Sequence, residues 1–338
     1  MSLRRSIINK ANEDPVLAKI VKSLSWQWKA AKKLEVPKIV TPGTAMPIKV
    51  SSDGKVTYED TKHIYFDENK SPLISVTTLL GAFKPPFDAE RMSTYCAEKE
   101  GYETNCLVKP DNWESLSTPV RAEMIRMAWE QNRNEAADYG TFTHACLEHK
   151  GRNIDLTPVA VLDQMKEKFG DSITHIEPML GPIPNFIYEF EWFWHKPKFR
   201  HIGEVRFEPI LYDFDISVAG QSDVVIIDHK NKRIHIADHK TNKHKPGSEL
   251  DAPRNNMLGP LSHLFTNDIT SYRLQLCLYQ AFLVKMMPGY GYGTNWILWL
   301  NRETGKIEPI EVDPREEALN IRAIYRYMLE NKNKIYNE

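Results

Sequence analysis

The segment 216–241 constrains the fold of this chain more than any other part. Residues 224–227 read Val-Val-Ile-Ile, a run of β-branched side chains that is typical of a buried strand. A polar, turn-like stretch follows, and residues 234–238 then alternate apolar and polar side chains. This pattern predicts a β-hairpin. It would bring Asp223 and Asp238 near each other across two paired strands.

A lysine accompanies the two acids of this hairpin. Lys240 follows Asp238 by two residues, so on a strand both side chains point to the same face. Carboxylates suit Mg²⁺, which takes oxygen ligands and keeps several waters. A nearby ammonium group can hold an attacking water or offset charge while a phosphodiester bond is cleaved. Because an exposed ion pair can have the same spacing, the hypothesis depends on the residues that accompany it.

Three of these accompanying residues lie upstream. The segment 202–212 is a further strand candidate, interrupted by Pro209, and it offers Glu204 as another acid. A helix is expected to begin at Thr118 and to run past Gly140. It carries His144 and Glu148 on one face, four residues apart. A ligand role is favoured for His144, whereas Glu148 is equally compatible with orienting the imidazole.

The ordered set of motifs resembles the PD-(D/E)XK nuclease superfamily. It comprises Gly-Thr-x-x-His-x-x-x-Glu at 140–148, Glu204, Gly-x-x-Asp at 220–223, Asp-x-Lys-Thr at 238–241 and Gln-x-x-x-Tyr at 275–279. The order and the last motif resemble the RecB-type branch. Ser-Val-Thr-Thr-Leu-Leu at 75–80 is similar to a motif of the mitochondrial genome maintenance exonuclease and its phage and bacterial relatives. The resemblance extends from about residue 65 to residue 300.

The resemblance implies a role for each matching position. The ligands of one or two Mg²⁺ or Mn²⁺ ions would be His144, Asp223, Asp238 and the backbone carbonyl of His239. The catalytic group would comprise Lys240, Asp238, Asp223 and Glu204, with Glu204 assisting a second metal. Support of the site and contact with DNA would come from Gln275, Tyr279, Thr241, Lys243 and Lys245.

The implied fold is α/β. It has a restriction-endonuclease-like core, a mixed β-sheet flanked by helices, with helical additions at both ends. The expected organisation is a basic helical N-terminal extension at 1–60, a nuclease domain at 61–312 and a C-terminal helix at 313–338 packed on that domain. An exonuclease acting on single-stranded or frayed DNA ends and leaving 5′-phosphate and 3′-hydroxyl is the favoured function. A structure-dependent endonuclease is the second alternative. A non-catalytic nucleic-acid or protein-interaction module is the third, and the intact set of motifs argues against it.

Charge and cysteine content limit which partners and which cellular compartment are expected. A net charge of −1 does not indicate a nucleic-acid binder by itself, but residues 1–40 and 229–245 are locally basic. The four cysteines are not spaced like the ligands of an iron–sulfur cluster, and no such cluster is expected. Their low number indicates a reducing compartment. No apolar run reaches the ~18 residues of a membrane span. The expectation is the cytoplasm of a bacterial or phage-infected cell rather than a mitochondrion, with DNA and proteins of replication or recombination as partners.

Several further elements are expected along the chain. A helix should begin at Asp14-Pro15 with an apolar stripe that includes Leu17, Ile20 and Leu24. The alternating aromatic residues at 186–194 predict a strand. Residues 244–270, rich in Pro and Gly, predict a long loop that could gate the entry of DNA. The remaining expectations are a hairpin at 55–67, a helix at 272–287, a hairpin at 296–312 and a final helix after Asp313-Pro314.

Overall fold

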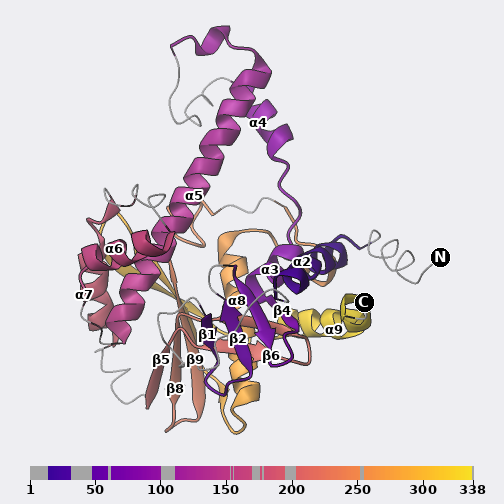
Figure 1. Ribbon diagram of the computed structural model, residues 1–338, viewed down its shortest axis with the longest axis vertical. Coiled ribbons are helices and arrows are strands. Elements are labelled where there is room, and N and C mark those ends of the chain that lie inside the picture. The colour runs from indigo at the N-terminus through magenta and orange to yellow at the C-terminus, as the bar shows by residue number, and fades with distance from the viewer. Residues whose placement is uncertain are drawn as a thin grey trace, which may run out of the picture. The chain divides into compact units, whose positions relative to one another are not determined.

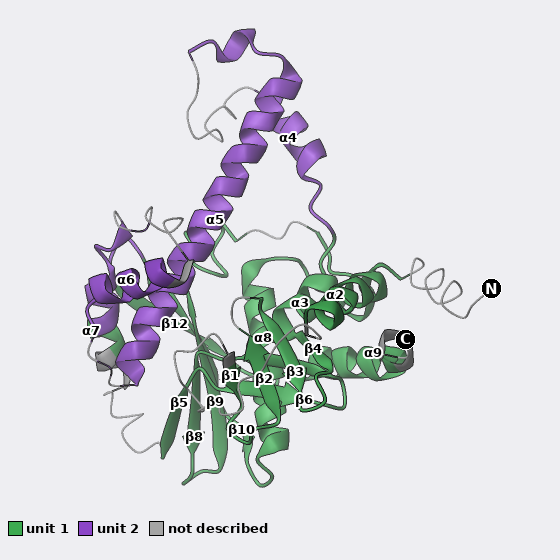
Figure 2. Ribbon diagram, viewed as in Figure 1, with its two compact units in different colours: residues 1–85, 188–301, 306–338 green, residues 86–187, 302–305 purple. Residues whose placement is uncertain are grey.

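The chain divides into two compact units in the computed structural model (Figure 2). Unit 1 comprises residues 1–85, 188–301 and 306–338, and unit 2 comprises residues 86–187 and 302–305. The structure describes residues 14–31, 48–59, 62–99, 111–152, 154, 156–169, 176, 179–194, 203–251 and 255–336. Much of the predicted N-terminal extension, residues 1–13 and 32–47, therefore lies outside the described residues.

A mixed six-stranded sheet of unit 1 carries the predicted hairpin. Across the sheet its strands are β12 (Lys306–Val312), β11 (Asn295–Asn301), β9 (Arg233–Lys240), β8 (Val224–Asp228) and β5 (Glu204–Phe207). The pair β8–β9 is antiparallel, and β9 runs parallel to β11 and to the short β10 (Gly291–Tyr292). The hairpins predicted around 216–241 and 296–312 are confirmed as β8–β9 and β11–β12.

A second six-stranded sheet in the same unit begins with a predicted hairpin. Its strands are, in order, β1 (Ile48–Val50), β2 (Val56–Glu59), β3 (Ile64–Asp67), β4 (Pro72–Ser75), β7 (Val218–Gln221) and β6 (Ile210–Asp213). The expected hairpin at 55–67 is confirmed as β2–β3. The strand candidate 202–212 splits at Pro209 because β5 belongs to the first sheet and β6 to the second.

Among the described residues, four α-helices lie wholly in unit 1: α2 (Pro15–Ala31), α3 (Val76–Ala82), α8 (Asp268–Met286) and α9 (Ala318–Tyr336). Helix α8 contacts β9 and β11 of one sheet and β6 of the other. Its buried side chains, among them Leu274 and Phe282, join those of both sheets in one apolar core. The predicted fold class, a mixed β-sheet flanked by helices, is confirmed.

Asp14 connects α2 and α9 of unit 1 through hydrogen bonds of its side chain. The Asp14 carboxylate accepts hydrogen bonds from the backbone N–H groups of Val16 (2.9 Å) and Leu17 (3.2 Å), which caps α2. Its second oxygen accepts a hydrogen bond of 2.7 Å from the Tyr327 hydroxyl on α9. The apolar stripe predicted for α2 is buried at Leu17, Ile20 and Leu24.

Unit 2 is helical in its described residues. It contains α4 (Ala89–Ala97), the 3₁₀ turn η2 (Trp113–Ser115), α5 (Thr118–Gly151) and α6 (Pro158–Phe169). Helix α5 runs without a break through Gly140, as predicted, with Ser117 at its N-cap. Helix α4 lies beside α5 (Figure 1), and the two bury Cys96, Ala122 and Ile125.

The strand predicted from the aromatic residues at 186–194 is wrong, because these residues belong to helix α7 (Ile183–Trp194). Ile183, Phe186 and Phe190 are buried, and their spacing of three and four residues is that of one helical face. Tyr188, between two of them, is 64 % exposed. The side chains at 191–194 lie outside the described residues.

Within the part of the chain that the structure describes, no helix has the length and apolar character needed to cross a membrane.

Candidate active site

The register of the β8–β9 hairpin brings the two predicted aspartates together. Val224 pairs with Ala237, so Asp223, one residue before β8, lies next to Asp238 on β9. The Asp223 carboxylate accepts a hydrogen bond of 2.6 Å from the backbone N–H of His239, the residue after Asp238. Asp238 is buried, and the side chain of Asp223 is only 12 % exposed. The two acids therefore form one polar group at the end of a buried strand pair.

The imidazole of His239 packs inside this group rather than toward solvent. Its Nδ1 lies 3.3 Å from a carboxylate oxygen of Asp223, and its ring centroid lies 5.5 Å from that of Phe190 on α7. The ring is almost fully buried. His239 thus contacts Asp223 through both its backbone and its side chain, which fixes the orientation of that carboxylate.

Lys240 is surrounded by three groups of unit 1. Its Nζ forms an ion pair with Asp238, donates a 3.3 Å hydrogen bond to Oε1 of Gln275 and lies 4.4 Å from the ring centroid of Tyr272. Burial lowers the pKa of Lys240, but the charge of Asp238 and the neighbouring groups outweigh it and raise the pKa to about 12. The lysine is therefore a cation whose position is fixed by groups from β9 and α8.

The predicted pair Gln275 and Tyr279 lies on α8 directly behind the lysine. Nε2 of Gln275 donates a hydrogen bond of 3.2 Å to the Tyr279 hydroxyl. Burial, followed by the charge of Asp238, raises the pKa of Tyr279. Tyr279 packs against Gly220 of β7 so closely that a Cβ at residue 220 would lie 2.5 Å from a ring carbon of the tyrosine. The glycine of the Gly-x-x-Asp motif is therefore required by the close approach of this ring.

A further acid, Glu208, lies beside Asp223 and was missed in the sequence. Its side-chain oxygen and that of Asp223 lie within 4.8 Å of each other. The backbone N–H of Glu208 donates a hydrogen bond of 2.9 Å to the Asp223 carbonyl, and Lys49 lies 3.7 Å from its carboxylate. Pro209 carried part of the signal, because a strand interrupted by proline leaves Glu208 in the break between two strands.

Glu204 lies at the other end of β5. It pairs with Ile227, whereas Phe207 pairs with Val224, so Glu204 lies three residues, about 10 Å, from the end near Asp223. Its carboxylate contacts Arg206 at 2.6 Å and His229 at 3.6 Å. The hydrogen bond from Arg206 lowers the pKa of Glu204 despite partial burial. Glu204 thus belongs to a surface ion-pair cluster at the β8–β9 turn.

The other residues predicted to support the site or contact DNA come directly after β9 in the chain. Thr241 is half-buried, Lys243 is exposed, and Lys245 forms an ion pair of 2.8 Å with Glu308 on β12. Asn242 joins this segment to α8 and β11 through two hydrogen bonds. Its side chain accepts a hydrogen bond from the Tyr272 hydroxyl (2.8 Å), and its carbonyl accepts one from the Trp299 indole (2.9 Å).

The long loop predicted at 244–270 is anchored to α8. Asp251 accepts hydrogen bonds from the backbone N–H groups of Gly247, Asp268 and Ile269, each at 2.8 to 2.9 Å. Asn267 caps the helix through the N–H of Thr270 at 3.1 Å. The loop also contains the turn η4 (Gly259–Leu261). These bonds hold the loop close to the first turn of the helix that carries Gln275.

The histidine motif belongs to unit 2. His144 is half-buried on α5, and Glu148, four residues on, forms an ion pair of 2.8 Å with Arg152. Arg152 is the C-cap of α5, so this ion pair lies at the end of the helix.

The cysteines at 96, 146 and 277 are buried free thiols, and Cys106 lies outside the described residues. Burial raises the pKa of Cys146 and of Cys277 to about 12, which keeps both thiols protonated.

Comparison with known proteins identifies the family. A sequence profile of the PD-(D/E)XK nuclease superfamily matches residues 120–331, and the chain belongs to this superfamily. It is accordingly a metal-dependent nuclease whose substrate is nucleic acid. No curated protein matches the chain. A solved structure titled "Crystal structure of SSO0001" is similar at 14 % identity and a TM-score of 0.26, covering 58 % of this chain and 75 % of that chain.

The contact between Gly220 and Tyr279 predicts a local steric defect. Gly220→Ala places a methyl group against a buried ring and should lower the free energy of unfolding by about 1–3 kcal/mol. Gly81→Ala is the matched control, because a Cβ there meets nothing within 4 Å and residue 81 is an exposed helix position. This control should be neutral or stabilising by roughly 0.5–1 kcal/mol. Urea denaturation measures both, and equal midpoints for the two variants would contradict the packing argument.

Proposed function

We propose that the protein is a Mg²⁺- or Mn²⁺-dependent deoxyribonuclease of the RecB-type branch, acting from single-stranded or frayed DNA ends. The observation that carries the proposal is the chain of neighbouring acids that ends at the fixed cation Lys240: Glu208 lies beside Asp223, Asp223 lies next to Asp238, and Asp238 is paired with Lys240. Such a group of carboxylates with one lysine suits in-line attack of water on a phosphodiester, which leaves 5′-phosphate and 3′-hydroxyl ends. The order of the motifs and the Gln275–Tyr279 pair support the RecB-type assignment.

The residues present fit a hard divalent cation. All three acids offer carboxylate oxygens, which Mg²⁺ and Mn²⁺ prefer, and those of Glu208 and Asp223 lie within 4.8 Å of each other. Asp223, Asp238 and the backbone carbonyl of His239 would hold the ion, and we propose His144 as a further ligand by resemblance. Bound there, the ion would supply Lewis-acid activation of the scissile phosphate.

Each remaining group of the chain has a separate task. The Lys240 ammonium would hold the attacking water and offset the charge that develops on the phosphate. Gln275 and the Tyr272 ring keep that ammonium in place from the α8 side. We assign the role of the additional acid to Glu208 instead of Glu204, because Glu208 lies beside Asp223 while Glu204 pairs with Arg206.

Removal of the lysine tests its role in catalysis. Lys240→Ala should abolish cleavage of end-labelled DNA in Mg²⁺ while leaving DNA binding intact, because the lysine acts mainly on the transition state.

Variants of the two glutamates test which acid assists the metal. Glu208→Gln should reduce cleavage of the same DNA by roughly 10- to 100-fold, the range for a residue that tunes a metal site. Glu204→Gln is the matched control and should cleave like the parent protein. Loss of activity in Glu204→Gln with a fully active Glu208→Gln would reverse the assignment. A parent protein inactive in both Mg²⁺ and Mn²⁺ would indicate a non-catalytic binding module.

A pair of substitutions at Tyr272 tests the position of the lysine. Tyr272→Phe keeps the ring over the ammonium and loses only the bond to Asn242, so kcat should stay within about threefold. Tyr272→Leu removes the ring and should lower kcat by roughly 30-fold, since a desolvated cation–π contact contributes about 2 kcal/mol. Single-turnover cleavage at saturating DNA separates this effect from binding. Equal rates for Phe and Leu would show that the aromatic face has no part in positioning Lys240.

The preference for ends is supported by the resemblance to exonucleases. It is also supported by the described residues of 241–251 and 255–267, which follow the Lys240 end of β9 and are anchored to α8. A bordered site favours a flexible single strand over a stiff duplex.

Linear and circular substrates test this preference. Linear single-stranded DNA should be degraded, and covalently closed single-stranded circles of the same sequence should resist under the same conditions. Gel analysis of initial rates with Mg²⁺ measures the difference, and Lys240→Ala serves as the blank. Equal rates on circles and linear strands would make the protein an endonuclease.

A further inference from the structure

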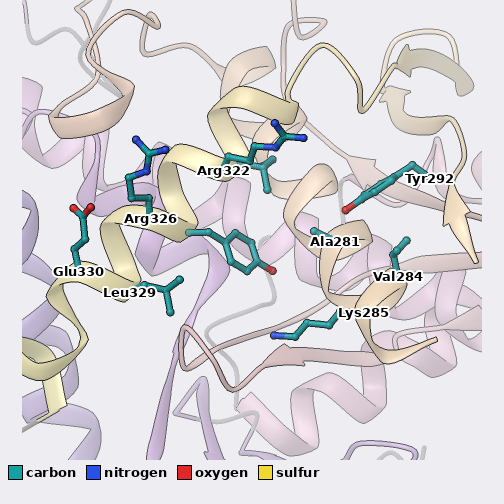
Figure 3. Close-up of a pocket in the computed structure, with 10 residues that line it drawn as sticks. Ala281, Val284, Lys285, Tyr292, Arg322, Arg326, Leu329 and Glu330 are labelled. Carbon is teal, nitrogen blue, oxygen red and sulfur yellow. The ribbon is translucent and has the colours of Figure 1, made fainter. Parts of the chain in front are cut away.

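A groove of about 620 Å³ lies between α8 and α9 in unit 1 (Figure 3). Ala281, Val284 and Lys285 of α8 line one side, and residues of α9 line the other. Most of its surface is apolar, with Ile321, Tyr325 and Leu329 contributing from α9. Leu329 is 51 % exposed, whereas Ile321 and Tyr325 on the same helix are half-buried.

The charges on the rim of this groove are not balanced. Lys285 is neutralised, because its Nζ forms ion pairs with Asp213 (2.6 Å) and Asp215 (2.5 Å). Arg322 and Arg326 are exposed on the opposite rim and form no ion pair with any residue that the structure describes. They are four residues apart, so their side chains leave α9 one turn apart, about 6 Å along the axis.

The groove also contains the hydroxyl group of Tyr292, and a second hollow lies next to it. Figure 3 shows the ring of Tyr292 directed into the groove from β10, with its hydroxyl toward Arg322. On the other side of α9, a hollow of about 260 Å³ is lined by Pro260 and Tyr327 and shares Arg326 and Glu330 with the groove. The two hollows thus meet at Arg326 and Glu330 on α9.

We propose that this groove binds an acidic, apolar peptide segment of a partner protein. The floor would take one or two aliphatic or aromatic side chains, and the guanidinium groups of Arg322 and Arg326 would form charge-assisted hydrogen bonds with carboxylates next to them. Charge complementarity favours a peptide with acids, because the only other free charge on the rim, among the described residues, is Glu330.

A nucleic-acid strand fits this surface less well. Nucleic-acid affinity comes from many phosphate contacts, whereas the groove offers two arginines and the carboxylate of Glu330, which repels phosphate. Its lining is mainly aliphatic, and its two rings, Tyr292 on β10 and Tyr325 on α9, come from different elements and form no row for base stacking. The groove is also built from a different face of α8 than Gln275 and Tyr279, so the inference does not depend on the proposed nuclease mechanism.

Selection from a random-peptide library displayed on phage tests the proposal. Against the full-length protein, the library should yield peptides in which Asp or Glu flanks an aromatic or aliphatic residue. Fluorescence anisotropy of a labelled selected peptide should show binding that the double charge reversal Arg322→Glu/Arg326→Glu weakens by at least about tenfold. Leu329→Ser should weaken the same peptide by about threefold or more through the lost apolar contact.

A control with the same change in net charge is available on α2. Lys22→Glu/Lys29→Glu reverses two exposed lysines far along the chain from the groove and should leave peptide binding unchanged. Selected peptides without acids, or peptides that bind the arginine variant as well as the parent, would overturn the proposal. Loss of oligonucleotide binding in the arginine variant, with no peptide selected, would assign the groove to nucleic acid instead.

Discussion

The buried ion pair between Asp238 and Lys240 is the interaction on which the site depends. The two side chains are 3 % and 15 % exposed, and the desolvation of a single charge at such a position costs several kcal/mol. Each group therefore needs the other, and both need further partners. Helix α8 supplies these to the lysine through Gln275 and Tyr272. Because β9 is paired on both edges, by β8 and by β11, the position of the ion pair is set by the sheet.

The acids gather where the chain changes from one sheet to the other. Between β5 and β8 it does so twice, from β5 to β6 at Glu208-Pro209 and from β7 to β8 at Ser222-Asp223. The two crossings are hydrogen-bonded to each other, through Glu208 N–H to the Asp223 carbonyl and Ser222 N–H to the Pro209 carbonyl (3.3 Å). At such points the ladder of each sheet ends, so side chains can approach that would be kept apart within a sheet. Glu208 has a positive φ of 54°, a conformation uncommon for a non-glycine residue.

The sequence predicted those features of the site that depend on local pattern. The β8–β9 hairpin, the helix with Gln275 and Tyr279 and the helix with His144 follow from periodicity and turn chemistry, and each is present. The strand at 186–194 was wrong because alternating aromatic residues also satisfy a helix when every third or fourth one is buried. Glu208 was missed because its closeness to Asp223 depends on the β5–β8 register, which pairs residues distant in sequence.

The bond between Asp14 and Tyr327 has a consequence for synthesis of the chain. The two residues are separated by 313 positions, so the cap of α2 can form early from neighbouring residues, whereas its bond to Tyr327 requires α9 to have left the ribosome. Until then α2 can pack on α3 and β4, which follow it closely, but its contact with α9 is missing. Such a contact contributes to the stability of the finished protein and nothing to the early stages of its folding. Unit 1 thus gains this late contact from the same helix, α9, that lines one side of the groove.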